Sequence, residues 1–275
     1  ESACYRASKD IEDRINIRHK SGNSFQDAEL KGVEEYVIEC SILKVAVSED
    51  CQNIADEGIQ IFGGMGFSAD TPMESAWRDS RISRIYEGTN EINRMLSIGM
   101  ILKKAMKGEL DIMSAYQDII ENKSEETLET SDELNNEITL VENMKKVFLL
   151  LLGKSFEKFG PEIDKNQQVL LSLSDLAIET YISESTLKRT VKNIKRTSTI
   201  DQEYQISMSK LYIYEAAKII EKKSRDIINS VIDDDNQENI YSSISKKLSY
   251  TKNPNIFELK IHVADKIIAE NKYCF

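Results

Sequence analysis

Glycine and proline are scarce along this chain, and the few that occur are unevenly placed. The 275 residues include only eleven glycines and three prolines. A sandwich, a barrel or a many-stranded sheet needs frequent tight turns, and those turns depend on glycine and proline. The scarcity therefore argues against most β-rich folds and predicts an all-α protein. Seven of the eleven glycines lie between Gly58 and Gly108, which marks this stretch as the one with unusual backbone requirements.

Apolar residues recur at alternating steps of three and four along much of the chain, which is the spacing of one face of a helix. The longest such stripe runs from Asp27 to Gly58 and predicts a single helix of roughly thirty residues. Pro72 is expected in the first turn of a following helix. Thr89 is expected to cap a further helix that ends near Gly108.

Acidic residues divide the chain into three parts. Residues 109–142 contain eleven Asp or Glu and one basic residue, whereas the whole chain carries a net charge of −11. The remainder is therefore close to neutral. We expect a helical domain at residues 1–107, an acidic linker at 108–142 and a second helical bundle at 143–275. The linker is expected to be partly disordered, with a loose helix around residues 112–120.

Composition also bears on the classes of partner. The negative charge argues against nucleic acid, because proteins that follow a phosphate backbone need a basic surface. The longest uninterrupted apolar run, Val147 to Leu152, is far shorter than the about 20 residues of a membrane-spanning helix. The four cysteines lie far apart and the two histidines have no neighbour at ligand spacing. We therefore expect free thiols in a reducing compartment and no metal site.

The first of two distinctive motifs is glycine-rich and reads Gln60-Ile61-Phe62-Gly63-Gly64-Met65-Gly66-Phe67. Adjacent glycines let a backbone approach a ligand closely and leave N–H groups free to meet an anion. A helix that ends in a glycine cap explains the same residues without any ligand. No strand precedes the motif, so it is not a dinucleotide-binding turn of the GxGxxG kind.

The second motif, Ile85-Tyr86-Glu87-Gly88-Thr89-Asn90-Glu91, lies between two predicted helices. A carboxylate in so tight a connection can project away from both helices into a cavity. Apolar surroundings there raise the pKa of a carboxyl group and make it a competent general base. The free N–H groups at the start of the next helix favour a phosphate or a developing oxyanion. The alternative is that Glu87 is a solvated residue beside a helix cap.

The two motifs together, QIFGGMGF followed by WRDSRISRIYEGTNEI, resemble the C-terminal helical domain of the acyl-CoA dehydrogenases. This resemblance covers residues 1 to about 107. The stretch FGPEIDKNQQVLLSLSDLAIETY at 159–181 resembles, more loosely, the extra C-terminal domain of the very-long-chain type. The implied fold is a four-helix-bundle-like domain followed by a second helical bundle. The chain starts inside an amphipathic pattern without an initiator Met, so we expect a missing N-terminal part, and without it an inactive fragment.

The resemblance implies an FAD-dependent enzyme that oxidises a long-chain acyl-CoA to the trans-2-enoyl-CoA in fatty acid β-oxidation. Glu87 matches the catalytic base of the medium- and very-long-chain types. It would take a proton from Cα while a hydride leaves Cβ for FAD, and its N–H would bond the thioester carbonyl. The implied substrate-binding positions are Tyr86, Glu87 and Gly88, and the implied FAD-binding positions are Gln60, Phe62, Gly63, Gly64, Thr89 and Glu91. Many relatives have Gln in place of Glu91, which argues against a direct phosphate contact there.

The resemblance also implies partners and a location. These are an acyl-CoA substrate, a second copy of the chain in a homodimer, and an electron-transfer flavoprotein as acceptor. The expected compartment is the cytoplasm of a bacterium, or the mitochondrion of a eukaryote. Very-long-chain relatives lie on a membrane through the region between the two domains. The charge of residues 109–142 would be repelled by anionic lipid, so weak or absent membrane contact is expected.

An interaction or assembly protein that keeps the dehydrogenase fold without its catalysis is the alternative function. The intact Tyr86-Glu87-Gly88-Thr89 sequence argues against it. A protein that no longer catalyses the reaction has no reason to keep a glutamate in that connection.

Overall fold

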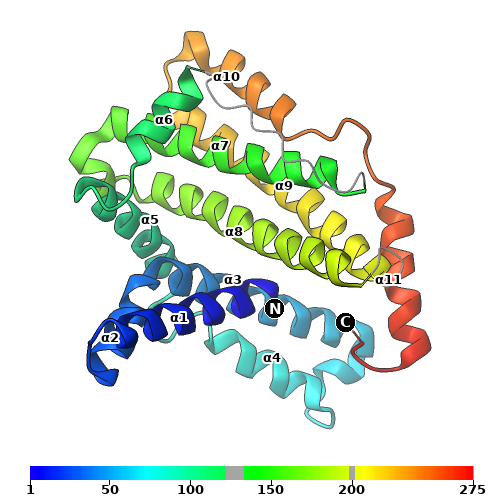
Figure 1. The fold of residues 1–275 in the computed structure, drawn as a ribbon. Helices are drawn as coiled ribbons and strands as arrows, with labels where there is room; N and C mark the ends of the chain where they lie inside the picture. Colours follow the sequence, from blue (N-terminus) through cyan, green and yellow to red (C-terminus); the bar gives the residue numbers. More distant parts are fainter. Residues whose placement is uncertain (122–132, 198–201, 275) are drawn as a thin grey trace. The chain divides into compact units, whose positions relative to one another are not determined.

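The computed structural model describes residues 1–121, 133–197 and 202–274. Within these ranges the chain is built of α-helices joined by short turns, and no β-strand occurs in them (Figure 1). The all-α prediction is confirmed. The chain divides into two compact units, one formed by Glu1–Arg6 with Leu110–Phe275 and the other by Ala7–Glu109. We call them the C-terminal unit and the N-terminal unit and describe each by itself.

The N-terminal unit is organised around one long helix. Its elements are α1 (Ser2–Lys20, of which the first residues belong to the other unit), α2 (Phe25–Glu35), α3 (Val37–Phe62), the 3₁₀ helix η1 (Gly63–Phe67), α4 (Pro72–Ile82) and α5 (Asn90–Met106). Helix α3 packs against α4, α5 and η1. Pro72 lies in the first turn of α4, and Thr89 caps α5 by accepting a hydrogen bond from the Ile92 N–H at 3.3 Å. Both of these helix starts agree with the sequence prediction.

The predicted continuous helix from Asp27 to Gly58 is wrong, because the chain breaks at Tyr36 into α2 and α3. Two contacts with α1 hold α2 in its own direction. Glu35 accepts hydrogen bonds from Arg14 at 2.6 Å and Arg18 at 2.9 Å. A Cβ at Gly32 would lie 2.5 Å from the Ile15 side chain, so the backbone of α2 lies directly on α1. The apolar stripe keeps its spacing through the break, which is why it predicted one helix.

The C-terminal unit is a second helical bundle. Its elements are α6 (Ile112–Ile120), α7 (Asn135–Phe159), the 3₁₀ helix η2 (Gly160–Lys165), α8 (Gln167–Arg196), α9 (Glu203–Val231), α10 (Asp234–Lys247) and α11 (Ile256–Glu270). Helices α7, α8 and α9 lie side by side (Figure 1), and α6 packs on α7 while α10 and α11 pack on α9. The fully buried side chains Met144, Leu151, Leu173, Ile213 and Ile220 come from all three central helices and form the core.

The structure places helices inside the acidic stretch 108–142 that was expected to be a linker. It contains α6, at the expected residues 112–120, and the first two turns of α7. Tyr116 of α6 is fully buried against Gly153 of α7, where a Cβ would lie 2.4 Å from the Tyr116 ring. Such apolar contacts order the helices despite their charge. The part expected to be disordered falls mainly on residues 122–132, which lie outside the described residues.

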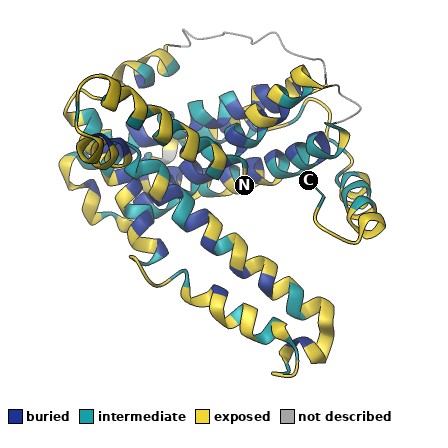
Figure 2. Cartoon of the chain, turned by 60° about the horizontal axis from the view of Figure 1, so that its bottom comes forward, coloured by how far each residue is buried: buried dark blue, intermediate teal, exposed yellow. Residues whose placement is uncertain are grey.

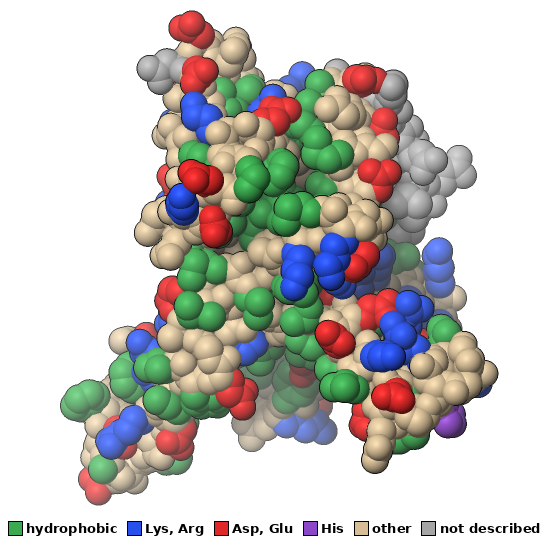
Figure 3. Space-filling view, turned by 90° about the vertical axis from the view of Figure 1, so that its left-hand side faces the viewer, with side chains coloured by type: hydrophobic (Ala, Val, Ile, Leu, Met, Phe, Trp, Pro, Cys, Tyr) green, Lys and Arg blue, Asp and Glu red, His purple; other side chains and the backbone are tan. Residues whose placement is uncertain are grey.

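The composition of the described part adds three observations. No helix in it combines the length and the apolar content needed to cross a bilayer. No group of three or more His, Cys, Asp or Glu side chains in it is arranged to hold a metal ion. Acidic and basic side chains are interspersed on the face shown in Figure 3.

Candidate active site

Glu87 adopts a backbone conformation that is unusual for a residue with a side chain. Its φ is +55°, and Gly88 follows with φ +80°. The left-handed region suits glycine, and a residue with a Cβ stays there only when its surroundings impose it. Glu87 lies between the end of α4 at Ile82 and the start of α5 at Asn90. The short connection therefore turns through two successive left-handed residues, and the first of them is the predicted base.

Two side chains hold this connection by its carbonyl groups. The Asn93 amide donates hydrogen bonds to the carbonyl oxygens of Gly88 at 2.9 Å, Thr89 at 3.2 Å and Glu87 at 3.4 Å. The Lys44 ammonium, from α3, also donates to the Gly88 carbonyl at 2.7 Å. The N–H groups of Glu87, Gly88 and Thr89 donate to no acceptor among the described residues. The carbonyl groups of this connection therefore accept hydrogen bonds within the protein, whereas its three N–H groups remain available to a ligand.

A buried polar cluster fixes the start of α5 against α3. Asn90 is only 1% exposed, and its amide donates to Ser48 Oγ and to Glu49 Oε1, both at 3.0 Å. The side-chain oxygen of Asn90, Oδ1, accepts a hydrogen bond from the Lys44 ammonium at 2.8 Å. Arg94 binds both Glu49 oxygens, at 2.7 and 2.8 Å. Burial by itself raises the pKa of Glu49, but the hydrogen bonds from Arg94 and Asn90 outweigh it and lower that pKa below its ordinary value.

This cluster was not predicted from the sequence, although the residues of α5 carry a signal for it. Asn90, Asn93 and Ser97 are all buried and lie at helical spacing on one face of α5. A core-facing stripe is normally apolar, so three polar side chains in it indicate a buried hydrogen-bond network.

The remaining residues around Glu87 face outward. Glu87, Tyr86 and Gly88 are exposed, so the described residues of the N-terminal unit do not enclose the carboxylate in the apolar cavity that the sequence analysis considered. At the start of α5, the pKa of Glu91 is lowered by a hydrogen bond from its own backbone N–H and by the Thr89 hydroxyl. Glu91 is therefore anionic at neutral pH.

The glycine-rich motif forms the turn from α3 into η1. Gly63 ends α3 with φ +60° and ψ −145°, a conformation available essentially to glycine alone. A Cβ at Gly63 or Gly64 would meet nothing within 4 Å, so both backbones are open to a ligand. The neighbouring Ile61 and Phe62 side chains are 81% and 52% exposed. Most of the end of α3 and η1 is exposed in Figure 2.

Gly66 in the same motif has a packing role instead. A Cβ there would lie 2.5 Å from the Ile59 carbonyl oxygen. We expect Gly66→Ala to destabilise the N-terminal unit by about 1–3 kcal/mol, because backbone atoms cannot move aside cheaply. The matched control is Gly64→Ala, which has open space and is expected to be neutral or slightly stabilising, by up to about 1 kcal/mol. Urea unfolding of both variants measures the difference, and equal stabilities would contradict the packing role.

The structure does not bring the two motifs together within one chain. Lys44 contacts the Glu87 connection, whereas Gln60 begins the glycine-rich motif sixteen residues further along the same helix. At 1.5 Å per residue this separates them by about 24 Å along α3. The two motifs are therefore separate parts of the surface of the N-terminal unit.

Comparison with known proteins gives a consistent result. Two family models, both described as "Acyl-CoA dehydrogenase, C-terminal domain", match residues 25–102 and 143–246. A probable acyl-CoA dehydrogenase of Bacillus subtilis (strain 168) is 34% identical over 277 residues, covering 99% of this chain and 46% of that protein. The human mitochondrial short-chain specific acyl-CoA dehydrogenase is 43% identical over 68 residues, 25% of this chain and 16% of that protein.

A solved structure matches over the full chain. The crystal structure of an acyl-CoA dehydrogenase complexed with FAD from Bacillus anthracis superimposes with a TM-score of 0.92 at 34% identity, covering 100% of this chain and 47% of that one. The chain belongs to the acyl-CoA dehydrogenase family and consists of its C-terminal helical domains. The two Bacillus proteins are matched by nearly all of this chain, which spans about half of the length of each of them.

Proposed function

We propose that this chain is the C-terminal part of an FAD-dependent acyl-CoA dehydrogenase in which Glu87 is the catalytic base. The observation that carries the proposal is the connection around Glu87. Its left-handed backbone is held by Asn93 and Lys44, its carbonyl groups are occupied and its N–H groups are free. Strain that is kept in place by a dedicated network is typical of active sites.

The proposed chemistry is removal of the Cα proton of an acyl-CoA thioester. The Glu87 carboxylate accepts this proton, and the Glu87 N–H donates a hydrogen bond to the thioester carbonyl oxygen, where negative charge develops. Both contributions come from one residue, so the backbone conformation sets the direction of the carboxylate relative to the donor. FAD, when bound, supplies the acceptor for the hydride from Cβ. Tyr86 and Gly88 are proposed to border the thioester.

The proposed FAD contacts agree with the local geometry. Gly63 and Gly64 present open backbone, and Gln60 and Phe62 are exposed beside them. We assign these four residues to the adenosine diphosphate part of an FAD bound mainly by a neighbouring subunit, which accords with their distance from Glu87. Thr89 and Glu91 are assigned to the FAD of their own subunit. The anionic Glu91 would repel a phosphate, so its place is near a neutral part of the cofactor.

Three finer assignments complete the proposal. The very-long-chain type rests on residues 159–181 and on the second helical unit that carries them. It implies a long-chain substrate oxidised in β-oxidation. A short-chain relative also matches 68 residues, so family membership alone does not select the chain length. We further propose a homodimer, with an electron-transfer flavoprotein as the electron acceptor.

Flavin content and flavin reduction of the full-length protein test the proposed function. The purified protein is expected to show flavin absorbance that bleaches when palmitoyl-CoA is added without oxygen. Butyryl-CoA is the comparison for chain length, and faster bleaching by the butyryl compound would contradict the long-chain assignment. A protein that binds neither flavin nor acyl-CoA would instead be the assembly protein considered above.

A further inference from the structure

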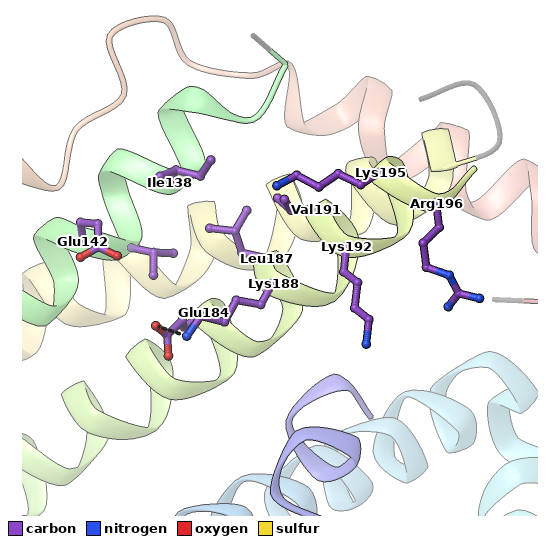
Figure 4. A pocket seen from close by; sticks show the side chains of 10 residues that line it. Ile138, Glu142, Glu184, Leu187, Lys188, Val191, Lys192, Lys195 and Arg196 are labelled. Carbon is purple, nitrogen blue, oxygen red and sulfur yellow. Dashed lines mark ion pairs between the residues drawn. The ribbon is translucent and has the colours of Figure 1, made fainter. Parts of the chain in front are cut away.

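An open groove lies between α7 and α8 of the C-terminal unit, and nothing in the proposed function uses it. Its volume is about 540 Å³. Ile138 and Val141 of α7 and Leu187 and Val191 of α8 form its apolar floor. Figure 4 shows Ile138, Leu187 and Val191 pointing toward one another across it. The floor is almost wholly aliphatic, which favours a ligand with a hydrocarbon part.

The two ends of this groove differ in how their charges are paired. At one end Glu184 pairs with Arg6 at 2.6 Å, Lys145 at 2.7 Å and Lys188 at 2.8 Å, and Glu142 pairs with the same Lys145 at 2.7 Å. At the other end Lys195 extends over the groove toward α7 (Figure 4), and it has no ion-pair partner among the described residues. Each of these charged groups at the first end therefore has a partner, whereas the other end keeps a positive charge that is unpaired within the described part of the chain.

The surrounding sequence strengthens the positive end. Residues 187–196 contain five Lys or Arg and no acidic residue, in a chain whose net charge is −11. Cations in the last turn of a helix offset its dipole, which explains their presence at the end of α8. The dipole does not explain an aliphatic floor beside them.

We propose that this groove binds a long-chain fatty acyl carboxylate, with the carboxylate on Lys195 and the hydrocarbon chain along Val191, Leu187 and Val141 toward Glu184. Lys195 and Glu184 are eleven residues apart, about 16 Å along α8, a length that an extended acyl chain spans. The inference rests on the groove alone and holds independently of the proposed function.

An acidic amphipathic helix of a partner protein is the other occupant with this chemistry, and the distribution of charge argues against it. Such a helix presents carboxylates along its length, whereas the cations that lack a partner in the described ranges lie at one end of the groove. A single extended chain fits a cavity in the range of about 300–1,000 Å³ typical of small-molecule sites. Of these cations, Lys195 alone extends over the groove in Figure 4, which matches a single terminal carboxylate.

Photolabelling of the full-length protein with a diazirine-bearing palmitate tests the proposal. Labelled peptides are expected from residues 138–142 and 187–196, and unlabelled palmitate should compete while butyrate should not. Lys195→Glu is expected to weaken palmitate binding at this site at least tenfold. The matched control is Lys222→Glu, an exposed lysine of α9 away from the groove, expected to change binding less than twofold.

A second variant separates binding from folding. Val191→Asp places a charge on the apolar floor and should abolish labelling, while the thermal unfolding curve of Lys195→Glu should match that of the unmodified protein. The proposal is overturned if no label reaches these two segments, or if Lys195→Glu leaves labelling unchanged. It is also overturned if an uncharged palmitoyl analogue labels equally well. Binding of anionic vesicles or of an acidic helical peptide without labelling by palmitate would assign the groove to those ligands instead.

Discussion

Replacing Glu87 by glutamine in the full-length protein is expected to lower kcat with palmitoyl-CoA by about 10⁴-fold while FAD stays bound. Glutamine has nearly the same shape as glutamate but cannot accept the Cα proton. The backbone N–H of residue 87 remains, and Asn93 and Lys44 still hold the connection. KM should therefore change little. Steady-state kinetics together with the flavin absorbance spectrum measure both effects.

The matched control for this variant is Glu29→Gln, which removes an exposed carboxylate from α2 of the same unit. It is expected to leave kcat and KM unchanged. Near-normal turnover by Glu87→Gln would remove Glu87 from the role of base. Loss of FAD from Glu87→Gln would instead show that the residue supports the cofactor site.

The second large effect concerns the stability of the C-terminal unit. Burial by itself raises the pKa of Glu184, but hydrogen bonds from Lys145, Lys188 and Arg6 outweigh it and lower the pKa to about 2. A carboxyl group with an ordinary pKa of 4.5 thus binds its proton less readily in the folded protein than in the unfolded chain. By linkage, the ionised group stabilises the fold above pH 4.5, and this contribution is lost as the pH falls toward 2.

We expect Glu184→Gln to destabilise the unit by about 2–3 kcal/mol at pH 7, because a pKa unit corresponds to about 1.4 kcal/mol and Glu184 is only slightly exposed. The difference from the unmodified protein should shrink below pH 4. Urea unfolding at pH 7 and pH 3 measures it. The control is Glu162→Gln, which breaks an exposed pair with Lys165 and should cost less than about 1 kcal/mol. Equal effects of the two variants would contradict the prediction.

Local signals in the sequence predicted the ends of helices well. Thr89 caps the start of α5, and the helix ends at Met106, close to the predicted end near Gly108. Those features depend on one or two residues and their immediate neighbours. The break at Tyr36 was not predictable in this way, because Gly32 and Glu35 contact the preceding helix α1, at residues 17 to 21 positions earlier in the chain.

The candidate site shows the same division. The motif identified Glu87 as a candidate base, and its role as base stays a prediction. Its left-handed backbone and its support by Lys44 could not be predicted, since Lys44 lies more than forty residues earlier in the chain. Net charge was a weaker guide to the acidic stretch. The sequence predicted a linker with one loose helix around residues 112–120; that helix is α6, anchored by the buried ring of Tyr116, and α7 begins within the same stretch.

The buried cluster around Asn90 also restricts how α3 and α5 can pair. An aliphatic seam between two helices tolerates a slip by one turn, about 5.4 Å, because one branched side chain replaces another. The same slip here would separate Asn90 from Ser48 and Glu49, and would leave the Glu49 carboxylate and the Arg94 guanidinium unpaired. Unpaired buried polar groups raise the free energy of the shifted arrangement, so this cluster fixes the register between α3 and α5. The position of Glu87 along α3 is thereby fixed to within a fraction of a helical turn.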